Sequence, residues 1–186
     1  NAQLDERAYQ LSQFLNGMGH ASAYVPRDGY GTVELLRDNP YAFFSHRHAA
    51  YLAGLGTFGL NNMLLTREFG PRQRFVSVFT TAEIPSGRPM EKQLCVRCMR
   101  CVKACPVQAI GDIEYPKASI DKMKCTGRSI ELKKRYRSPC GICIKVCPVG
   151  EDRKLYRRKD MGLYDGPEKD PDLFKAWEHV RKYGST

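Results

Sequence analysis

The chain has 186 residues, of which 42% are hydrophobic and 27% charged, a composition that excludes a disordered protein. Its longest uncharged apolar runs, such as residues 63–65 and 75–79, are too short to cross a bilayer, and no secretory signal is visible. The formal net charge of +10 favours acidic partners or nucleic acid.

The first half of the chain predicts a mixed lobe of helices and strands. In chain order, the predicted elements are a helix over residues 3–18, a strand over 21–25, short helices over 33–37 and 49–53, and strands over 62–66 and 74–81. The first helix carries an apolar stripe, namely Leu4, Ala8, Leu11, Leu15 and Met18. The lobe is expected to end near Ile84, because residues 85–89 have the proline, serine and glycine composition of a linker.

Residues 151–186 form a tail that is basic at first and closes with a clearly punctuated helix. Asp170 is the predicted N-cap, Pro171 stands at the first helical position and Gly184 follows the end. The apolar stripe of this helix consists of Leu173, Phe174, Trp177 and Val180. We expect this stripe to pack back on the body of the protein.

Cysteine spacing organises the chain from residue 95 to residue 147. The first run has the pattern C-x2-C-x2-C-x3-C-P over residues 95–106, and the second has C-x2-C-x3-C-P over residues 140–148, with Cys125 upstream. Gaps of two residues let the thiolates of one tight loop bind three corners of a single [4Fe-4S] cube, while the cysteine before the proline reaches the neighbouring cube. The spacing therefore predicts two [4Fe-4S] clusters.

Each cluster is expected to take one ligand from the other run. The first predicted ligand set is Cys95, Cys98, Cys101 and Cys147, and the second is Cys105, Cys125, Cys140 and Cys143. A zinc site or a disulfide scaffold is the alternative, but neither usually repeats this spacing with a proline after each last cysteine. The clusters predict an intracellular, reducing and anaerobic setting, and at about −2 each they lower the net charge to roughly +6.

Apolar and positive side chains accompany both runs. The apolar ones are expected to limit water access and so to influence the cluster potentials; they are Val96, Val102, Val107, Ile110, Ile142, Ile144 and Val146. The cations are either solvated surface residues or a docking site for an acidic electron donor; they are Arg97, Arg100, Lys103 and Lys145.

A longer segment carries a family resemblance. Residues 45–66 (SHRHAAYLAGLGTFGLNNMLLT), with residues 68–72 and 75–83, resemble the segment before the clusters in epoxyqueuosine reductases and reductive dehalogenases. The shared features are an alanine-glycine-leucine-glycine motif, a glycine-x-asparagine motif and a leucine pair. The displaced cysteine at position 125 also has a counterpart there, and the likeness extends from about Leu4 to Pro148.

The resemblance implies a cobalamin-dependent reductase architecture, in which a lobe related to flavin nitroreductase-like folds precedes a two-cluster ferredoxin module. Electrons would pass from a ferredoxin or flavodoxin type of donor through both clusters to a corrinoid between the two parts. By resemblance, the loop near the corrin or the cluster interface comprises Gly54, Gly56, Gly59 and Asn61.

The chain also departs from the family pattern. Members usually have further elements before the point that matches Asn1, so the chain resembles the C-terminal part of such a fold or a shortened relative. An acid ahead of the glycine motif assists catalysis in epoxyqueuosine reductase, and here only Asp38 and Tyr41 stand near that place. Residues 148–150 (PVG) replace a tryptophan and asparagine, and the tail is too short for helical repeats, so action on tRNA is doubtful.

Three further patterns have a structural interpretation beside a functional one. Residues 54–59 match the dinucleotide fingerprint but lack its βαβ context, so a tight loop is favoured. His46 and His48 are structural or surface residues, or one of them donates a proton to a substrate. The basic tracts over residues 133–137 and 153–159 form solvated or docking surfaces, or bind nucleic acid.

The sequence therefore predicts an α+β protein in three parts. These are a partial nitroreductase-like α/β lobe over residues 1–88, a bacterial-type two-[4Fe-4S] ferredoxin domain over 89–150, and a basic tail with a C-terminal helix over 151–186. We expect a cytoplasmic electron-transfer protein that delivers electrons to a cofactor or partner. The alternative is a catalytic oxidoreductase that binds cobalamin itself, and the sequence identifies no catalytic residue.

Overall fold

The computed structural model describes residues 2–27, 31–117, 120–137 and 139–184. Its helices are α1 (Ala2–Gly17), α2 (Leu35–Asp38), α3 (His46–Leu52), α4 (Arg100–Ala104), α5 (Lys122–Lys133), α6 (Ile142–Lys145), α7 (Asp152–Leu155), the 3-10 helix η1 (Gly162–Tyr164) and α8 (Pro171–Tyr183). Its strands are β1 (Ser22–Val25), β2 (Thr57–Phe58), β3 (Leu64–Leu65) and β4 (Ser77–Thr80). This mixture of helices and strands agrees with the predicted class. No helix in the described ranges is both long and apolar enough to span a bilayer.

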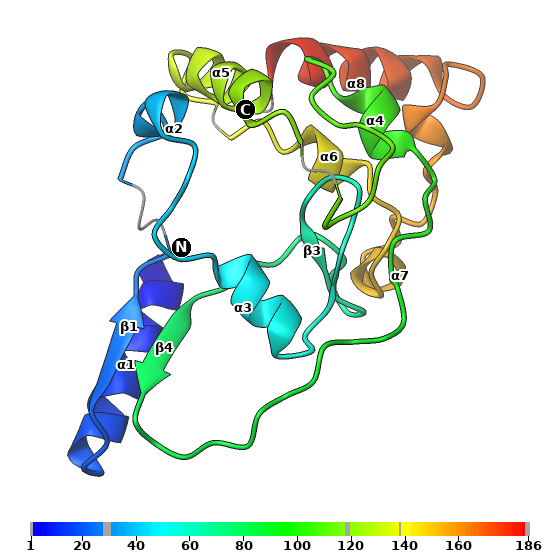
Figure 1. The fold of residues 1–186 in the computed structure, drawn as a ribbon. Coiled ribbons are helices and arrows are strands. Elements are labelled where there is room, and N and C mark those ends of the chain that lie inside the picture. Colours follow the sequence, from blue (N-terminus) through cyan, green and yellow to red (C-terminus); the bar gives the residue numbers. More distant parts are fainter. Residues whose placement is uncertain (1, 28–30, 118–119, 138, 185–186) are drawn as a thin grey trace.

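One end of the molecule is a helix beside a two-stranded sheet (Figure 1). β1 and β4 pair antiparallel with Ser22 opposite Thr80, whose side-chain oxygens are 2.7 Å apart, and α1 packs against both strands. Of the predicted stripe on α1, Ala8 is buried whereas Leu11 and Met18 are exposed. The sequence pattern thus predicts the helix correctly, but more of its apolar stripe is exposed to solvent than the pattern suggests.

The glycine-rich segment forms a second, smaller sheet. β2 and β3 pair antiparallel, with Thr57 opposite Leu65 and Phe58 opposite Leu64. All four residues are buried, and Phe58 and Leu64 form a core with Ala50 of α3. β3 lies within the predicted strand over residues 62–66, but β2 was missed because glycines flank it and obscure any alternating pattern.

The opposite end packs α4, α6 and α8 together (Figure 1). Its buried core consists of Ala104, Ile142, Val146 and Trp177. Phe174 and Val180 of α8 pack against this core as predicted, but Leu173 is 54% exposed, so that part of the prediction is wrong. Asp170 caps α8 by accepting the backbone N–H of Leu173 at 2.9 Å, and Pro171 is the first helical residue, which confirms the predicted punctuation.

Two arginines hold α5 and its following turn to the end of α8. The buried guanidinium of Arg128 donates to the carbonyl oxygens of Arg181 at 3.3 Å and Lys182 at 2.5 Å. Arg137 donates to the carbonyl oxygen of Tyr183 at 3.1 Å. Positive groups at a helix C-terminus satisfy its last carbonyls and oppose the negative end of its dipole. This link fixes the helix that carries one of the eight cysteines.

Candidate metal centres and the adjoining cavity

The two cysteine runs adopt matching backbone conformations. Met99 and Gly141 each stand inside a C-x2-C pair and each adopts the left-handed conformation, with φ of 60° and 64°. Such a φ is unusual for methionine, and in both runs it turns the chain so that α4 or α6 begins at the next residue. Since α4 and α6 also pack against each other, the ends of the two runs come together.

One set of thiols surrounds a small cavity of about 20 Å³. Its cysteine lining is Cys95, Cys98, Cys101 and Cys147, which are named the Cys147 group below. Within this group, the Cys147 side chain is buried and Cys98 is exposed. The group has the same members as the first predicted ligand set. Their role as ligands stays a prediction, which their shared cavity supports.

Burial raises the pKa of two thiols in the Cys147 group. The pKa of the Cys101 thiol is raised to about 12, first by burial and then by the other three thiols of the group. Burial also raises the pKa of Cys147 to about 11, although a hydrogen bond from the backbone of Val149 and the charge of Arg72 act to lower it. Buried thiols of this kind lose their protons when they bind a metal.

The remaining cysteines form a second set, named the Cys125 group: Cys105, Cys125, Cys140 and Cys143. Burial raises the pKa of Cys143 to about 12, and the next largest contribution comes from Cys125. The Sγ atom of Cys105 accepts a hydrogen bond from the backbone N–H of Ala109 at 3.2 Å. Because Cys101 of the other group also raises the pKa of Cys143, the two groups adjoin each other.

The donor chemistry of both groups fits [4Fe-4S] clusters, because each supplies thiols from separate parts of the chain. Within the described ranges, no three His, Cys, Asp or Glu side chains converge closely enough to hold a single metal ion. Thiolates around a four-iron cube each bind a different iron, so they need not converge on one point. A cube is therefore compatible with the wider spacing of these thiols.

Two arginines fix the backbone beside Cys147. Arg72 Nη1 donates to the Cys147 carbonyl oxygen at 3.0 Å, while Nε and Nη2 bind the two carboxylate oxygens of Asp152 at 2.5 and 2.7 Å. Arg153 donates to the same carbonyl from Nε at 3.2 Å and from Nη2 at 3.0 Å. The Asp152 side chain is only 9% exposed, and its hydrogen bonds to Arg72 lower the pKa of that carboxyl. Two guanidiniums therefore adjoin the Cys147 group, and the Asp152 carboxylate balances the charge of one of them.

Two of the four loop residues implied by the resemblance lie at the cysteine groups. Gly59 and Asn61 line the small cavity of the Cys147 group. The Nδ2 atom of Asn61 also donates to the carbonyl oxygen of Cys143, a member of the other group, at 3.3 Å. Asn61 thus contacts both groups, while binding of a cofactor by this loop stays a prediction.

The other two, Gly54 and Gly56, allow backbone segments to approach closely. A Cβ at position 56 would lie 2.0 Å from the carbonyl oxygen of Leu65, and one at position 54 would lie 2.2 Å from that of Arg88. Only glycine fits at such distances. β2 begins directly after Gly56, and no helix follows the glycine motif of residues 54–59 directly. The structure therefore favours a tight loop over a dinucleotide site.

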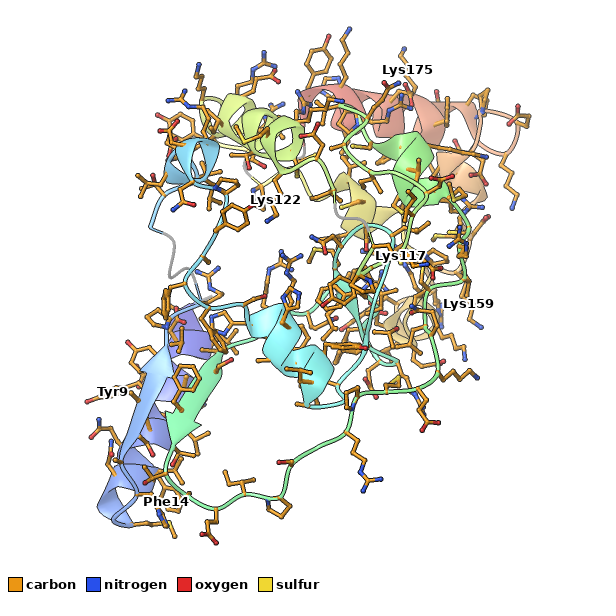
Figure 2. The ribbon with its side chains drawn as sticks, in the orientation of Figure 1. Tyr9, Phe14, Lys117, Lys122, Lys159 and Lys175 are labelled. Carbon is orange, nitrogen blue, oxygen red and sulfur yellow. The ribbon has the colours of Figure 1, made fainter. Side chains whose placement is uncertain are left out.

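A second cavity, of about 690 Å³, lies beside Cys125 and is named the large cavity. Its wall comes mainly from residues 25–27, 40–48, 62–64 and 73–75 and from residues between Tyr115 and Thr126. Figure 2 shows the side chains of this region between α3 and α5. The volume suits a small ligand or cofactor. The sequence did not reveal this cavity, because its wall is assembled from distant segments.

Of the residues considered for proton transfer, Tyr41 and His46 line the large cavity and Asp38 does not. Tyr41 lines the large cavity and is 70% exposed, whereas Asp38 ends α2 and is not part of the lining. Both ring nitrogens of His46 are engaged, Nδ1 with the Ser77 hydroxyl at 2.9 Å and Nε2 with the Pro26 carbonyl at 3.2 Å. These bonds favour a structural role for His46.

Residues 94–151, which contain both cysteine groups, match the family described as "4Fe-4S dicluster domain". The chain is also similar to two kinds of reductase. It is 28% identical over 159 residues to the tetrachloroethene reductive dehalogenase of Desulfitobacterium hafniense and 30% identical over 148 residues to the epoxyqueuosine reductase of Cyclobacterium marinum. These matches cover 76% and 73% of this chain but 26% and 45% of the relatives. The resemblance predicted from the sequence is confirmed.

Solved structures of both kinds share the fold. The TM-score is 0.60 with a reductive dehalogenase structure described with a mechanism for B12-dependent dehalogenation, at 22% identity over 94% of this chain and 25% of that chain. It is also 0.60 with an epoxyqueuosine reductase bound to a tRNA stem loop, at 21% identity over 98% of this chain and 48% of that chain. This chain is therefore related to iron-sulfur reductases and spans less than half of the length of these relatives. The nitroreductase-like description of the lobe stays a prediction.

Proposed function

We propose that this chain carries electrons through two [4Fe-4S] clusters, held by the Cys147 group and the Cys125 group, toward a molecule in the large cavity. The supporting observation is the arrangement of the thiols. They fall into two adjoining groups, and Cys125 of the second group borders the large cavity. When bound, each cluster accepts and releases one electron at a time.

The surroundings of the two groups support a direction of transfer. Cys98 is exposed, so the Cys147 group is accessible to a ferredoxin or flavodoxin type of electron donor. Ile142 and Val146 are buried beside the cysteines and exclude water from the region between the groups. Cys125 and Thr126 of α5 form part of the large-cavity wall, so the second group adjoins the acceptor.

Metal analysis of anaerobically reconstituted protein tests this function. We expect about eight irons for each chain, and electron paramagnetic resonance of the reduced protein should show two interacting centres. Bound zinc, or an iron content of about four in the intact chain, would contradict the proposal.

A second candidate function is catalysis by a bound cobalamin. The place of Cys125 in the wall of the large cavity and the likeness to a structure described with B12-dependent dehalogenation favour it. Bound cobalamin would supply a cobalt centre that takes electrons and reduces a substrate. In this arrangement, residues 40–48 and the start of α5 would enclose the cofactor.

Titration with hydroxocobalamin distinguishes the two candidates. A catalytic reductase should take up the cofactor and give a base-off absorption spectrum, whereas an electron carrier should keep the cluster spectrum alone. A role on tRNA, by contrast, requires RNA binding that weakens steeply with salt. Binding that does not change with salt would contradict that role.

A further inference from the structure

The segment that follows the Cys147 group forms an exposed, positively charged surface. It is named the basic surface and consists of Lys154, Leu155, Tyr156, Arg157, Arg158 and Lys159, all of which are exposed. Lys154 Nζ lies 2.6 Å from the Glu151 carboxylate. Within the described ranges, no carboxylate pairs with Arg157, Arg158 or Lys159. These three cations are therefore available to a negatively charged partner.

Other cations near the clusters are already matched by carboxylates of the same chain. Arg97 Nη1 donates to Glu114 Oε1 at 2.6 Å, and Arg100 Nη1 donates to Asp165 Oδ1 at 2.7 Å. Both arginines belong to the four cations that the sequence suggested for the docking of an electron donor. Because their charges are balanced, they attract an acidic partner less strongly than the basic surface does.

Hydrogen bonds fix the basic surface beside the backbone of Cys147. Arg153 is buried and donates to the Cys147 carbonyl oxygen, while its own carbonyl oxygen accepts the backbone N–H of Arg158 at 2.8 Å. At the start of α7, the backbone N–H of Asp152 donates to the Glu68 carbonyl oxygen at 2.8 Å. The rate of electron transfer falls steeply with distance, so a protein bound at this surface is well placed to reduce the nearer cluster.

Exposed apolar side chains accompany the positive charges. Leu155 and Tyr156 are 75% and 64% exposed, and Val96, which lines the small cavity of the Cys147 group, is 65% exposed. Cys98 of the same cavity is exposed as well. Protein interfaces combine an apolar centre with a charged rim, whereas nucleic acids are held chiefly through their phosphates. The combination therefore favours a protein partner over a nucleic acid.

The basic surface and the large cavity lie on different sides of the molecule. Residues 154–159 are all described, and none of them lines the large cavity. In Figure 1, α7 and α2 stand on opposite sides of β3, and Leu36 of α2 belongs to the cavity wall. A protein bound at the basic surface therefore leaves the large cavity open.

We propose that the basic surface docks an acidic protein that carries a one-electron centre and reduces the cluster at the Cys147 group. This inference rests on the proposed function, because it identifies where the electron donor of that function binds. One electron leaves the reduced donor and enters the cluster, whose charge changes from about −2 to about −3. The donor is oxidised by one electron, and no bond or proton is exchanged.

Stopped-flow reduction of the anaerobically reconstituted full chain by flavodoxin hydroquinone tests the proposed docking. Flavodoxin is acidic, and its semiquinone, the product of one-electron oxidation, absorbs at longer wavelengths than the clusters. The second-order rate constant should fall about tenfold between low and physiological salt, because screening weakens the attraction between the two proteins. Lys159→Glu and Arg158→Glu should each lower this constant about fivefold at low salt.

Lys175→Glu is the matched control for Lys159→Glu. Both lysines are exposed and both replacements change the charge equally, but Lys175 lies on α8 at the top of Figure 2 and Lys159 at its right. The control should change the rate constant less than about twofold, because its charge is screened from the basic surface.

Leu155→Asn tests the apolar part of the surface. Because Leu155 is exposed, its replacement should leave the fold intact. Calorimetric titration with oxidised flavodoxin should show an affinity about fivefold lower than that of the unaltered chain, with the same dependence on salt. An unchanged affinity contradicts the assignment of Leu155 to the docking surface.

Three results would overturn the inference. They are unchanged rates in both Lys159→Glu and Arg158→Glu, a loss in Lys175→Glu as large as that in Lys159→Glu, and unchanged rates combined with a stem-loop RNA whose binding both variants weaken. The last result assigns the surface to nucleic acid.

Iron analysis and dithionite reduction of the same samples separate this inference from the proposed function. About eight irons that dithionite reduces, together with flavodoxin rates that Lys159→Glu and Arg158→Glu leave unchanged, contradict the inference alone. Flavodoxin binding that depends on Lys159 in a chain with little iron supports the docking surface and contradicts the electron-transfer function.

Discussion

The Cys147 group and the Cys125 group share a backbone plan but differ in their surroundings. A left-handed residue precedes α4 and α6 alike, and each run ends in a cysteine followed by proline. Beside one group, Arg72 and Arg153 bind the Cys147 carbonyl; beside the other, Cys125 borders the large cavity. Cysteine spacing therefore describes what the groups have in common, whereas residues distant in sequence make them different.

The difference has an electrical consequence for bound clusters. A cluster gains negative charge on reduction, so nearby positive charge favours its reduced form and raises its potential. Two guanidiniums adjoin the Cys147 group, while Arg47 is the positive group that acts on Cys125. We therefore expect two distinguishable reduction potentials in this chain.

Removal of one cysteine from each group should have the largest effect. Cys98→Ala and Cys143→Ala should each lose one cluster, about four of eight irons, together with stability, because metal binding is coupled to folding. Iron counting and electron paramagnetic resonance measure the loss. An undiminished iron content in either variant would contradict the division into two ligand sets.

Replacement of Arg72 should affect one group selectively. Arg72→Gln leaves the Asp152 carboxylate, which is 9% exposed, without its ion-pair partner, and we expect a loss of about 3 kcal/mol in the free energy of unfolding. The potential of the cluster at the Cys147 group should fall while the other stays unchanged. Anaerobic denaturation and a spectroscopically monitored redox titration measure the two effects.

The matched control for Arg72 is Arg181→Gln on α8. Arg181 pairs with Glu178 at a well-exposed site, 2.9 Å apart, so its loss should cost less than about 0.5 kcal/mol and shift neither potential. Equal shifts of both potentials in Arg72→Gln would show that the two groups do not have separate surroundings.

The smallest expected effect is a pH dependence near the Cys125 group. Burial lowers the pKa of His48, and the charges of Arg47 and Lys122 act in the same direction. Below about pH 6.5 the unfolded chain therefore takes up a proton at His48 more readily than the folded chain, so stability falls as the pH drops through that value. His48→Gln should flatten the change in denaturation midpoint between about pH 7 and 5.5. If the denaturation midpoint of His48→Gln changes with pH as steeply as that of the unaltered chain, His48 is not the cause of the pH dependence.

Features encoded by neighbouring residues were predicted well. The cysteine spacing identified the dicluster domain, and the segment over residues 45–66 identified the related reductases. The start of α8 was correct because Asp170 and Pro171 act within one helical turn. The exposure of Leu173 could not be predicted, because the partner surface decides how much of an apolar stripe is covered.

The sequence analysis missed helix α5 and the features that are assembled from distant segments. α5 has a weak apolar pattern, although Asp121, which accepts the backbone N–H of Lys124 at 3.0 Å, was a local signal for its start. The large cavity combines residues from Val25 to Thr126, and no periodicity encodes such a meeting. The same holds for Arg72 and Asp152, which are 80 positions apart.

The bonds of Arg72 also cross the boundary between the lobe and the cysteine-rich part. Arg72 and Asn61 lie in the lobe predicted over residues 1–88, yet they bind Cys147, Asp152 and Cys143, which follow the predicted boundary. A chain cut after residue 88 would leave a carboxylate and two carbonyls without these donors. We therefore expect the lobe and the cysteine-rich part to unfold in one cooperative step, and an excised fragment that starts at residue 89 to retain its clusters less firmly than the whole chain.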